Sequence, residues 1–195
     1  MIIVLDGLPG AGKTTLVKRL VDECDFLEVP EMLVEYKDPE DGFITFDFET
    51  YFLNNDVLKC QKALELSKKS KNIVMDKNYL STIAFNYAVT ECKKGDSYDK
   101  VRSWFASHQE ALIKPDCYFF LSIPVELSFA RKQRKVGGTD FWGSEELLER
   151  MKDFFETKAN SFDTDVPKYT IDTEGSQDQV LEKIRTILAG IDKKT

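Results

Sequence analysis

A glycine-rich motif lies near the start of the chain, directly after an apolar run. Residues 7–14 read GLPGAGKT, which fits the pattern GxxxxGK[ST]. Ile2–Leu5 before it has the composition of a strand, and the residues after it have helical spacing. This order places successive backbone N–H groups around phosphate oxygens, with the positive end of a helix behind them. The motif therefore predicts a phosphate-binding loop between a strand and a helix.

The residues of this loop are candidates for contact with a nucleotide. Lys13 is expected to reach the β- and γ-phosphates, and the hydroxyl of Thr14 is expected to help hold Mg²⁺. ATP and Mg²⁺ are thus the expected cofactors, and the alternative is a chance match or a loop that binds no nucleotide. The candidate contacts are Gly7, Pro9, Gly10, Ala11, Gly12, Lys13, Thr14 and Thr15.

Apolar runs alternate with amphipathic segments along the rest of the chain. Strands are expected at Ile2–Leu5, Phe26–Val29, Asn72–Met75, Cys117–Ser122 and Tyr169–Ile171. Helices are expected at Thr14–Cys24, Phe46–Ser70, Leu80–Cys92, Tyr98–Ile113, Val125–Arg134, from Ser144 to about Ser161, and at Gln177–Ala189. This alternation predicts a single α/β domain over residues 1–195: a three-layer sandwich with a five-stranded parallel sheet and helices on both faces.

Composition argues against several classes of protein. The 195 residues carry a net charge of −7, whereas proteins that bind a nucleic-acid backbone need a basic face. No apolar stretch approaches the roughly 20 residues of a membrane span, and no leader sequence is visible. We therefore expect a soluble cytoplasmic protein with no nucleic-acid or membrane partner. Cys24, Cys60, Cys92 and Cys117 lack CxxC spacing and are expected to be reduced thiols, and His108, the single histidine, to be a surface or partly packed helix residue.

Acidic residues follow two of the expected strands. Ligands bind beyond the carboxyl ends of the strands in a parallel sheet, so these positions are candidates for chemistry. Glu31 follows the second strand and is a candidate general base for an acceptor hydroxyl. Asp76 ends the third strand and is a candidate for holding Mg²⁺ together with Thr14. The alternatives are a solvated loop acid for Glu31 and a helix N-cap for Asp76.

Two arginines lie three positions apart on the helix after the fourth strand. Arg131 and Arg134 therefore share one helix face, close to Gly137 and Gly138. We expect residues from about 132 to 144 to form a lid. The two guanidiniums would then offset the charge that builds up on the transferring phosphoryl group. The alternative is an ordinary basic helix end, which the helix dipole favours.

Taken together, these motifs resemble the P-loop kinases of nucleosides and nucleotides, thymidylate kinase and the deoxynucleoside kinases, over nearly the whole chain. Residues 76–85 (DKNYLSTIAF) are similar to the DRxxxS[ST]xAY segment of thymidylate kinases and to the ERS segment of deoxynucleoside kinases. Residues 115–116 (PD), residues 124–126 (PVE) and the arginine pair match the pattern that both share. The resemblance implies the P-loop NTPase fold, the lid arginines and phosphoryl transfer from ATP·Mg²⁺.

Two further segments are more similar to the deoxynucleoside kinases. Residues 29–31 (VPE) resemble their VPEP segment, whose Glu acts as base on the sugar 5′-hydroxyl. Residues 46–51 (FDFETY) resemble their helix start FxFQTY, whose Gln pairs with the nucleobase. Glu49 stands at that Gln, and an ionised carboxylate cannot donate a hydrogen bond, so base recognition would differ. Further candidates for the acceptor pocket, with core packing as the alternative for each, are Tyr51, Phe52 and Tyr79.

The basic residues bear on the choice of acceptor. Lys77 stands where both families carry an arginine, and lysine lacks the bidentate fork that grips phosphate. No arginine lies between Arg19 and Arg102. We therefore expect ATP-dependent phosphorylation of a hydroxyl on a nucleoside or nucleoside-like small molecule, with Lys77 in the acceptor site. The alternatives are a nucleoside monophosphate kinase, a kinase of another alcohol such as an antibiotic, and a nucleotide-dependent switch. The helices between residues 46 and 113 could also support a homodimer.

Overall fold

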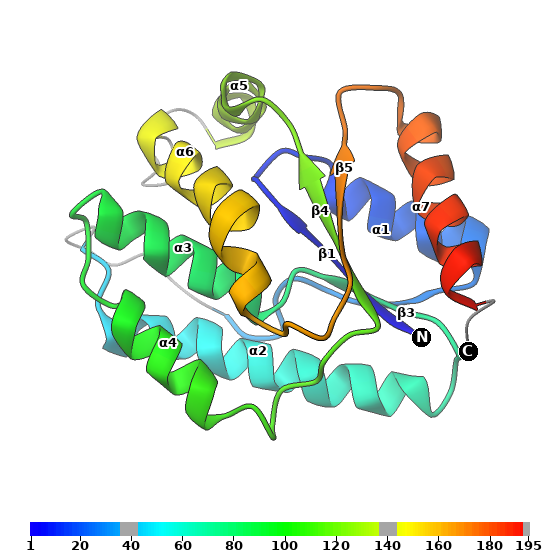
Figure 1. Cartoon of the computed structure of the whole chain (residues 1–195), viewed down its shortest axis with the longest axis horizontal. Helices are drawn as coiled ribbons and strands as arrows, with labels where there is room; N and C mark the ends of the chain where they lie inside the picture. The colour runs from blue at the N-terminus through cyan, green and yellow to red at the C-terminus, as the bar shows by residue number, and fades with distance from the viewer. Residues whose placement is uncertain (36–42, 137–143, 193–195) are drawn as a thin grey trace.

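The computed structural model describes residues 1–35, 43–136 and 144–192 (Figure 1). Within these residues the strands are β1 (Ile2–Gly7), β2 (Leu27–Val29), β3 (Ile73–Asp76), β4 (Cys117–Ser122) and β5 (Lys168–Asp172). They form a five-stranded sheet in the order β2-β3-β1-β4-β5, and every neighbouring pair is parallel. The predicted parallel sheet is confirmed.

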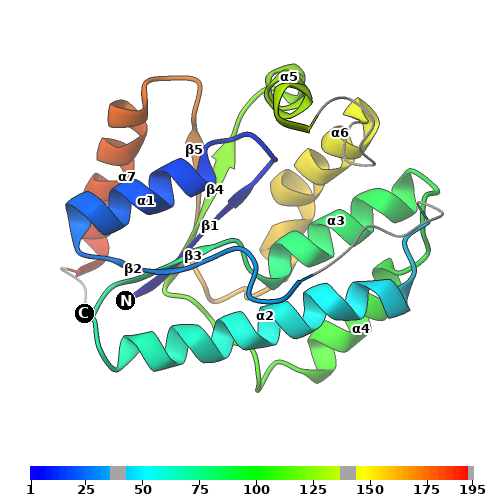
Figure 2. The ribbon, with the colours of Figure 1, turned by 180° about the vertical axis from the view of Figure 1, so that it is seen from behind.

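The helices form a layer on each side of this sheet. They are α1 (Lys13–Cys24), α2 (Phe46–Ser67), α3 (Tyr79–Glu91), α4 (Tyr98–Ser107), α5 (Val125–Val136), α6 (Glu145–Asp153) and α7 (Gln177–Asp192). Helices α1 and α7 lie on one face, and α2, α3 and α6 lie on the other with α4 outside them (Figures 1 and 2). Helix α5 lies beyond the end of β4. The chain is therefore a three-layer α/β sandwich, as its alternating pattern predicts.

Strand β1 lies at the centre of the sheet and is buried along its whole length. A strand covered on both faces needs a continuous apolar run, which Ile2–Leu5 supplies. In the register of the sheet, Leu5 lies opposite Asp76 of β3 and Phe119 of β4. The residues that follow these three strands therefore meet at one edge, and this edge carries the candidate site.

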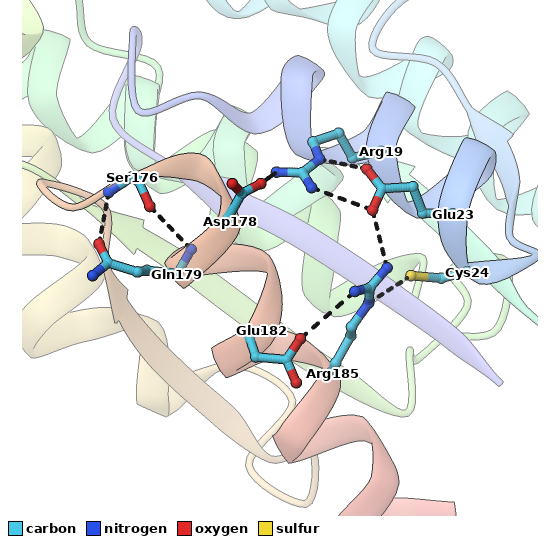
Figure 3. A network of polar contacts seen from close by, with 8 residues as sticks. All are labelled: Arg19, Glu23, Cys24, Ser176, Asp178, Gln179, Glu182 and Arg185. Carbon is cyan, nitrogen blue, oxygen red and sulfur yellow. Dashed lines mark hydrogen bonds and ion pairs between the residues drawn. The ribbon is translucent and has the colours of Figure 1, made fainter.

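A polar network fastens α7 to α1 (Figure 3). The guanidinium of Arg19 binds Glu23 within α1 and Asp178 at the start of α7, with N–O distances of 2.6 and 2.8 Å. The guanidinium of Arg185 on α7 reaches back to Glu23 and donates to the thiol sulfur of Cys24. Exposed ion pairs contribute little energy singly, but a network of this kind fixes the relative placement of two helices. The helix behind the phosphate loop is thereby held against α7.

Three of the described helices end at least three residues earlier than their sequence pattern predicts, and α2 ends at Ser67 instead of Ser70. Helix α4 ends at Ser107 instead of Ile113. The ring of His108 stacks on Trp104, and its Nδ1 lies 2.8 Å from the Trp104 carbonyl oxygen, which closes the last turn of the helix. Helix α6 ends at Asp153, and a π-helical turn over Phe154–Lys158 follows it. His108 is exposed, as expected.

The cysteines are reduced, as their spacing in the sequence predicts. Each of the four cysteines is a free thiol, and Cys60 and Cys117 are buried. Among the described residues, no helix is both long and apolar enough to cross a membrane.

Most of the expected lid, residues 137–143, lies outside the described residues. Ser144 at its end caps α6 by accepting a hydrogen bond from the N–H of Leu147.

Candidate active site

The phosphate loop, residues 7–14, joins the end of β1 to the start of α1. Gly7 has a φ of 118°, and a Cβ added there would lie 2.3 Å from the carbonyl oxygen of Leu121 on β4. Gly12 precedes the helix with a φ of 93°. Only glycine adopts these conformations readily, which explains the glycine spacing of the motif. Helix α1 begins at Lys13. The backbone N–H groups in the first turn of a helix have no partners within that helix, so they can bind an anion in the phosphate loop.

Lys13 lies over this loop with its ammonium group close to backbone oxygens. Its Nζ donates to the carbonyls of Gly7 and Leu8, each at 2.8 Å. Burial lowers the pKa of Lys13 to about 8, and the positive charge of Lys77 contributes to this effect. The carboxylates of Asp6, Asp76 and Glu31 attract this ammonium, and a bound phosphate group would be a further anionic partner. The position fits the predicted role of Lys13 in holding ATP phosphates.

Thr14 and Asp76 meet at the carboxyl edge of the sheet. The Thr14 hydroxyl donates to Oδ2 of Asp76 at 2.8 Å, although the two residues lie far apart in the chain. Oδ1 of Asp76 is buried and has no hydrogen-bond partner among the described residues. A buried carboxylate oxygen without a partner is costly, and a divalent cation would satisfy it. Hydroxyl and carboxylate oxygens are the ligands that Mg²⁺ prefers, so the pair could hold this ion.

The Glu31 carboxylate forms an ion pair with the Lys77 ammonium at this edge. Burial raises the pKa of Glu31, but the charge and hydrogen bond of Lys77, together with the charges of Lys13 and Lys59, outweigh burial and hold this pKa below its ordinary value. Burial of the ammonium lowers the pKa of Lys77, but its ion pair and hydrogen bond with Glu31, together with the charges of Asp76 and Asp6, outweigh burial and raise this pKa above its ordinary value. Glu31 is therefore an ionised carboxylate at neutral pH, as a proton acceptor must be.

Helix α5 contacts the phosphate loop through one of its faces. The Ser128 hydroxyl donates to the Pro9 carbonyl at 2.6 Å, and Nη1 of Arg131 donates to the Gly10 carbonyl at 3.0 Å. Arg131 therefore lies beside the phosphate loop, and its role at the transferring phosphoryl group stays a prediction. The side chain of Arg134 lies outside the described residues.

The candidates for the acceptor pocket fall into two groups. Tyr51 is exposed and Phe52 is half-buried, and both rings lie next to Phe48 on α2. Tyr79 is only 1% exposed, and its hydroxyl donates to the carboxylate of Asp163 at 2.7 Å. The structure therefore places Tyr79 in the core, which is the alternative that its sequence position left open.

Glu49 is also fully buried, between α2 and α3. Its Oε2 accepts a hydrogen bond of 2.6 Å from Asn86, and its Oε1 has no hydrogen-bond partner in the part of the chain that the structure describes. Burial raises the pKa of Glu49 to about 8, and the negative charge of Asp56 adds to this shift. At pH 7 this pKa favours the protonated form of Glu49, and a protonated carboxyl both donates and accepts, as a glutamine amide does.

Comparison with known proteins identifies the family. The family model described as deoxynucleoside kinase matches residues 3–193. The chain belongs to the deoxynucleoside kinase family. It is a kinase, and the alternative of a nucleotide-dependent switch is set aside.

Solved structures similar to this kinase share its fold. Deoxyadenosine kinase from M. mycoides with bound dATP has a TM-score of 0.68 at 20% identity, covering 97% of this chain and 100% of that one. The same kinase with the products dCMP and a flexible dCDP has a TM-score of 0.64 at 20% identity, covering 98% and 100%. These neighbours show that the sandwich is the P-loop NTPase fold.

Curated relatives of the kinase include thymidylate kinases. The thymidylate kinase of Leptospira interrogans serovar copenhageni is 24% identical over 213 residues, 100% of this chain and 97% of the relative. A protein of the Acidianus bottle-shaped virus with a provisional thymidylate kinase name is 28% identical over 98 residues. This match spans 50% of the kinase and about half, 55%, of that relative's length. The comparisons therefore leave two acceptor classes, nucleosides and nucleoside monophosphates.

Several polar residues at the site were missing from the sequence prediction. Asp6 at the end of β1 is buried and accepts hydrogen bonds from the Gly7 N–H and the Ser81 hydroxyl. Its place at a strand end could have identified it. Asn55 and Lys59 of α2 contact the segments that carry Glu31 and Asp76. Polar residues within a helix normally mark its exposed face, so nothing in the sequence distinguishes them.

Proposed function

We propose that this kinase transfers the γ-phosphoryl group of ATP to a hydroxyl of a nucleoside or a nucleoside-like small molecule. The observation that carries the proposal is the Glu31–Lys77 pair, which lies at the same edge of the sheet as the phosphate loop. An ionised carboxylate there can accept the proton of an acceptor hydroxyl as the new P–O bond forms. Phosphoryl transfer has a loose transition state and demands little basicity, so the low pKa of Glu31 is adequate.

The other residues of the site would position the donor. Lys13 and the loop N–H groups would bind the ATP phosphates, in place of the present contacts of Lys13 with loop carbonyls. Thr14 and Asp76 would hold Mg²⁺, which when bound neutralises charge on the donor phosphates. Arg131, and Arg134 with it, would close over the transferring group. The remaining loop residues from Gly7 to Thr15 would contact the donor through their backbone.

A nucleoside monophosphate is the second candidate acceptor, because thymidylate kinases are relatives of this chain. A monophosphate would need a cation of its own at the acceptor site. Lys77 is already paired with Glu31, and Lys37 lies outside the described residues. The pairing therefore favours a neutral hydroxyl over a charged phosphate. A homodimer remains a prediction.

A panel of acceptors tests the proposal. ADP release from ATP·Mg²⁺ would be measured with deoxynucleosides, ribonucleosides, their monophosphates and hydroxyl-bearing antibiotics. We expect a nucleoside to raise the rate at least about tenfold while its monophosphate does not. Stimulation by monophosphates alone would contradict the proposal and make Lys77 a phosphate-binding residue. Stimulation by an antibiotic alone would move the acceptor to another class of alcohol.

Arg131→Ala tests the role of α5. We expect kcat to fall about 100-fold, because the guanidinium would stabilise charge that develops in the transition state. Thermal stability should change little, since the guanidinium of Arg131 is tied to the loop by a hydrogen bond to the Gly10 carbonyl and is not part of the core. Arg150→Ala, at an exposed position on α6, is the control. An Arg131→Ala enzyme with unchanged turnover would remove Arg131 from the reaction.

A further inference from the structure

The inner face of α2 buries polar side chains next to the candidate site. Asn55, Asp56 and Lys59 are 3%, 3% and 1% exposed. Burying an amide or a charged group is unfavourable unless specific partners compensate for the lost water. Apolar side chains of similar size would fill this space without that penalty. The contacts of these groups therefore indicate what they do.

The amide of Asn55 binds the backbone around Glu31 with both of its ends. Nδ2 donates to the Glu31 carbonyl at 3.0 Å, and Oδ1 accepts from the Leu33 N–H at 2.7 Å. Glu31 lies beyond the end of β2, outside the hydrogen bonding of the sheet. Asn55 thus ties the segment that carries the candidate base to α2.

Lys59 makes the corresponding contact to β3. Its Nζ donates to the carbonyl of Asp76 at 2.6 Å, at the last residue of the strand. The next residue, Lys77, has a φ of 63°, a left-handed conformation that non-glycine residues rarely adopt. Burial lowers the pKa of Lys59, and attraction of its ammonium to the carboxylates of Asp56, Asp76 and Glu31 opposes this shift. Lys59 therefore holds the carbonyl at which the chain turns to direct Lys77 toward Glu31.

We propose that Asn55 and Lys59 are positioning residues that hold the Glu31 segment and the Asp76–Lys77 turn at a fixed separation. The two residues are four apart on α2, so they share one face and act from one rigid element. The consequence is that Glu31 meets Lys77 beside the pair formed by Thr14 and Asp76. The inference rests on the proposed function, because it assigns these groups to the reaction.

Kinetics of Lys59→Met provide the first test. Methionine keeps the apolar length of lysine and removes both the donor and the charge. We expect kcat with the best acceptor to fall about 10- to 100-fold, because a displacement on the order of 1 Å at reacting groups has effects of this size. KM values for ATP and the acceptor should stay within about threefold, since neither ligand contacts Lys59 in the proposal. A folded Lys59→Met enzyme with kcat within about twofold of the parent would overturn the inference.

Two control variants separate positioning from stability. Lys62→Met changes a half-exposed lysine on the same helix and should leave kcat unchanged. Cys60→Ala removes a fully buried neighbour and should lower stability without touching either carbonyl. If Cys60→Ala lowered kcat as much as Lys59→Met does, the effect would be a general loosening of α2, and the inference would be wrong.

Amide hydrogen exchange gives a readout that does not depend on the acceptor. We expect Asn55→Ala to raise exchange at the Leu33 N–H, which loses its partner. We expect Lys59→Met to raise exchange at the Lys77 N–H, which donates to the Leu5 carbonyl at the same turn. Amides in α7 should not change. Unchanged protection at both sites would refute the positioning role, whereas changed protection in a protein that phosphorylates no hydroxyl would refute only the proposed function.

Discussion

Glu31→Gln is expected to lower kcat about 10²- to 10⁴-fold. Glutamine has nearly the same shape, and its amide oxygen can still accept a hydrogen bond from Lys77. What it loses is the capacity to take a proton from the acceptor hydroxyl. The KM for ATP should stay within about threefold, because the proposed function assigns donor binding to Lys13 and the phosphate loop and not to Glu31. Steady-state rates of ADP release with the best acceptor would measure the effect.

The matched control for this prediction is Glu35→Gln. Glu35 is an exposed acid that follows the same strand, and its loss should leave kcat unchanged. Full turnover of Glu31→Gln would exclude Glu31 as the base. A raised KM for the acceptor with unchanged kcat would make Glu31 a group that only binds the acceptor. Because the pKa of Glu31 lies below its ordinary value, Glu31 stays ionised in mildly acidic solution. The turnover rate of the parent enzyme should therefore persist at pH values well below 7.

The chain's sheet and phosphate loop follow from local rules that a sequence expresses directly. Ile2–Leu5 must be apolar because both faces of β1 are covered, and Gly7 must lack a Cβ because β4 approaches it. Strand ends in a parallel sheet share one edge, so Glu31 and Asp76 could be assigned to the site before any distance was known. Such features depend on neighbours in sequence or on sheet geometry alone.

Other features of the site depend on which helix packs against which strand. Lys59 contacts Asp76 only because the middle of α2 lies against β3, and the helical pattern does not encode that position. Tyr79 follows a strand end as a ligand-binding residue would, yet the helix that it begins turns its ring into the core. The burial of Glu49 and its resulting protonation state could not be predicted from the sequence either. A carboxylate beside aromatic residues in a sequence does not show whether water reaches it.

Because Glu49 is buried, the stability of this kinase should fall as the pH rises. The pKa of Glu49 is raised to about 8 in the folded protein, and it is near the ordinary glutamate value in the unfolded chain. Between these two values the folded protein binds a proton that the unfolded chain lacks, so each increase in pH favours unfolding. The expected loss is on the order of 3–5 kcal/mol between about pH 5 and pH 9. Urea unfolding at each pH would measure the free energy of unfolding.

Glu49→Gln isolates the contribution of this one carboxyl group. Glutamine keeps a donor and an acceptor beside Asn86 and cannot ionise, so the variant should match the parent near pH 5 and be more stable by several kcal/mol near pH 9. A weaker slope should remain, because burial also raises the pKa of Asp56, to about 7. Glu65→Gln changes an exposed acid on the same helix and should retain the parent slope. An equally steep slope in Glu49→Gln would show that Glu49 does not hold a proton in the folded kinase.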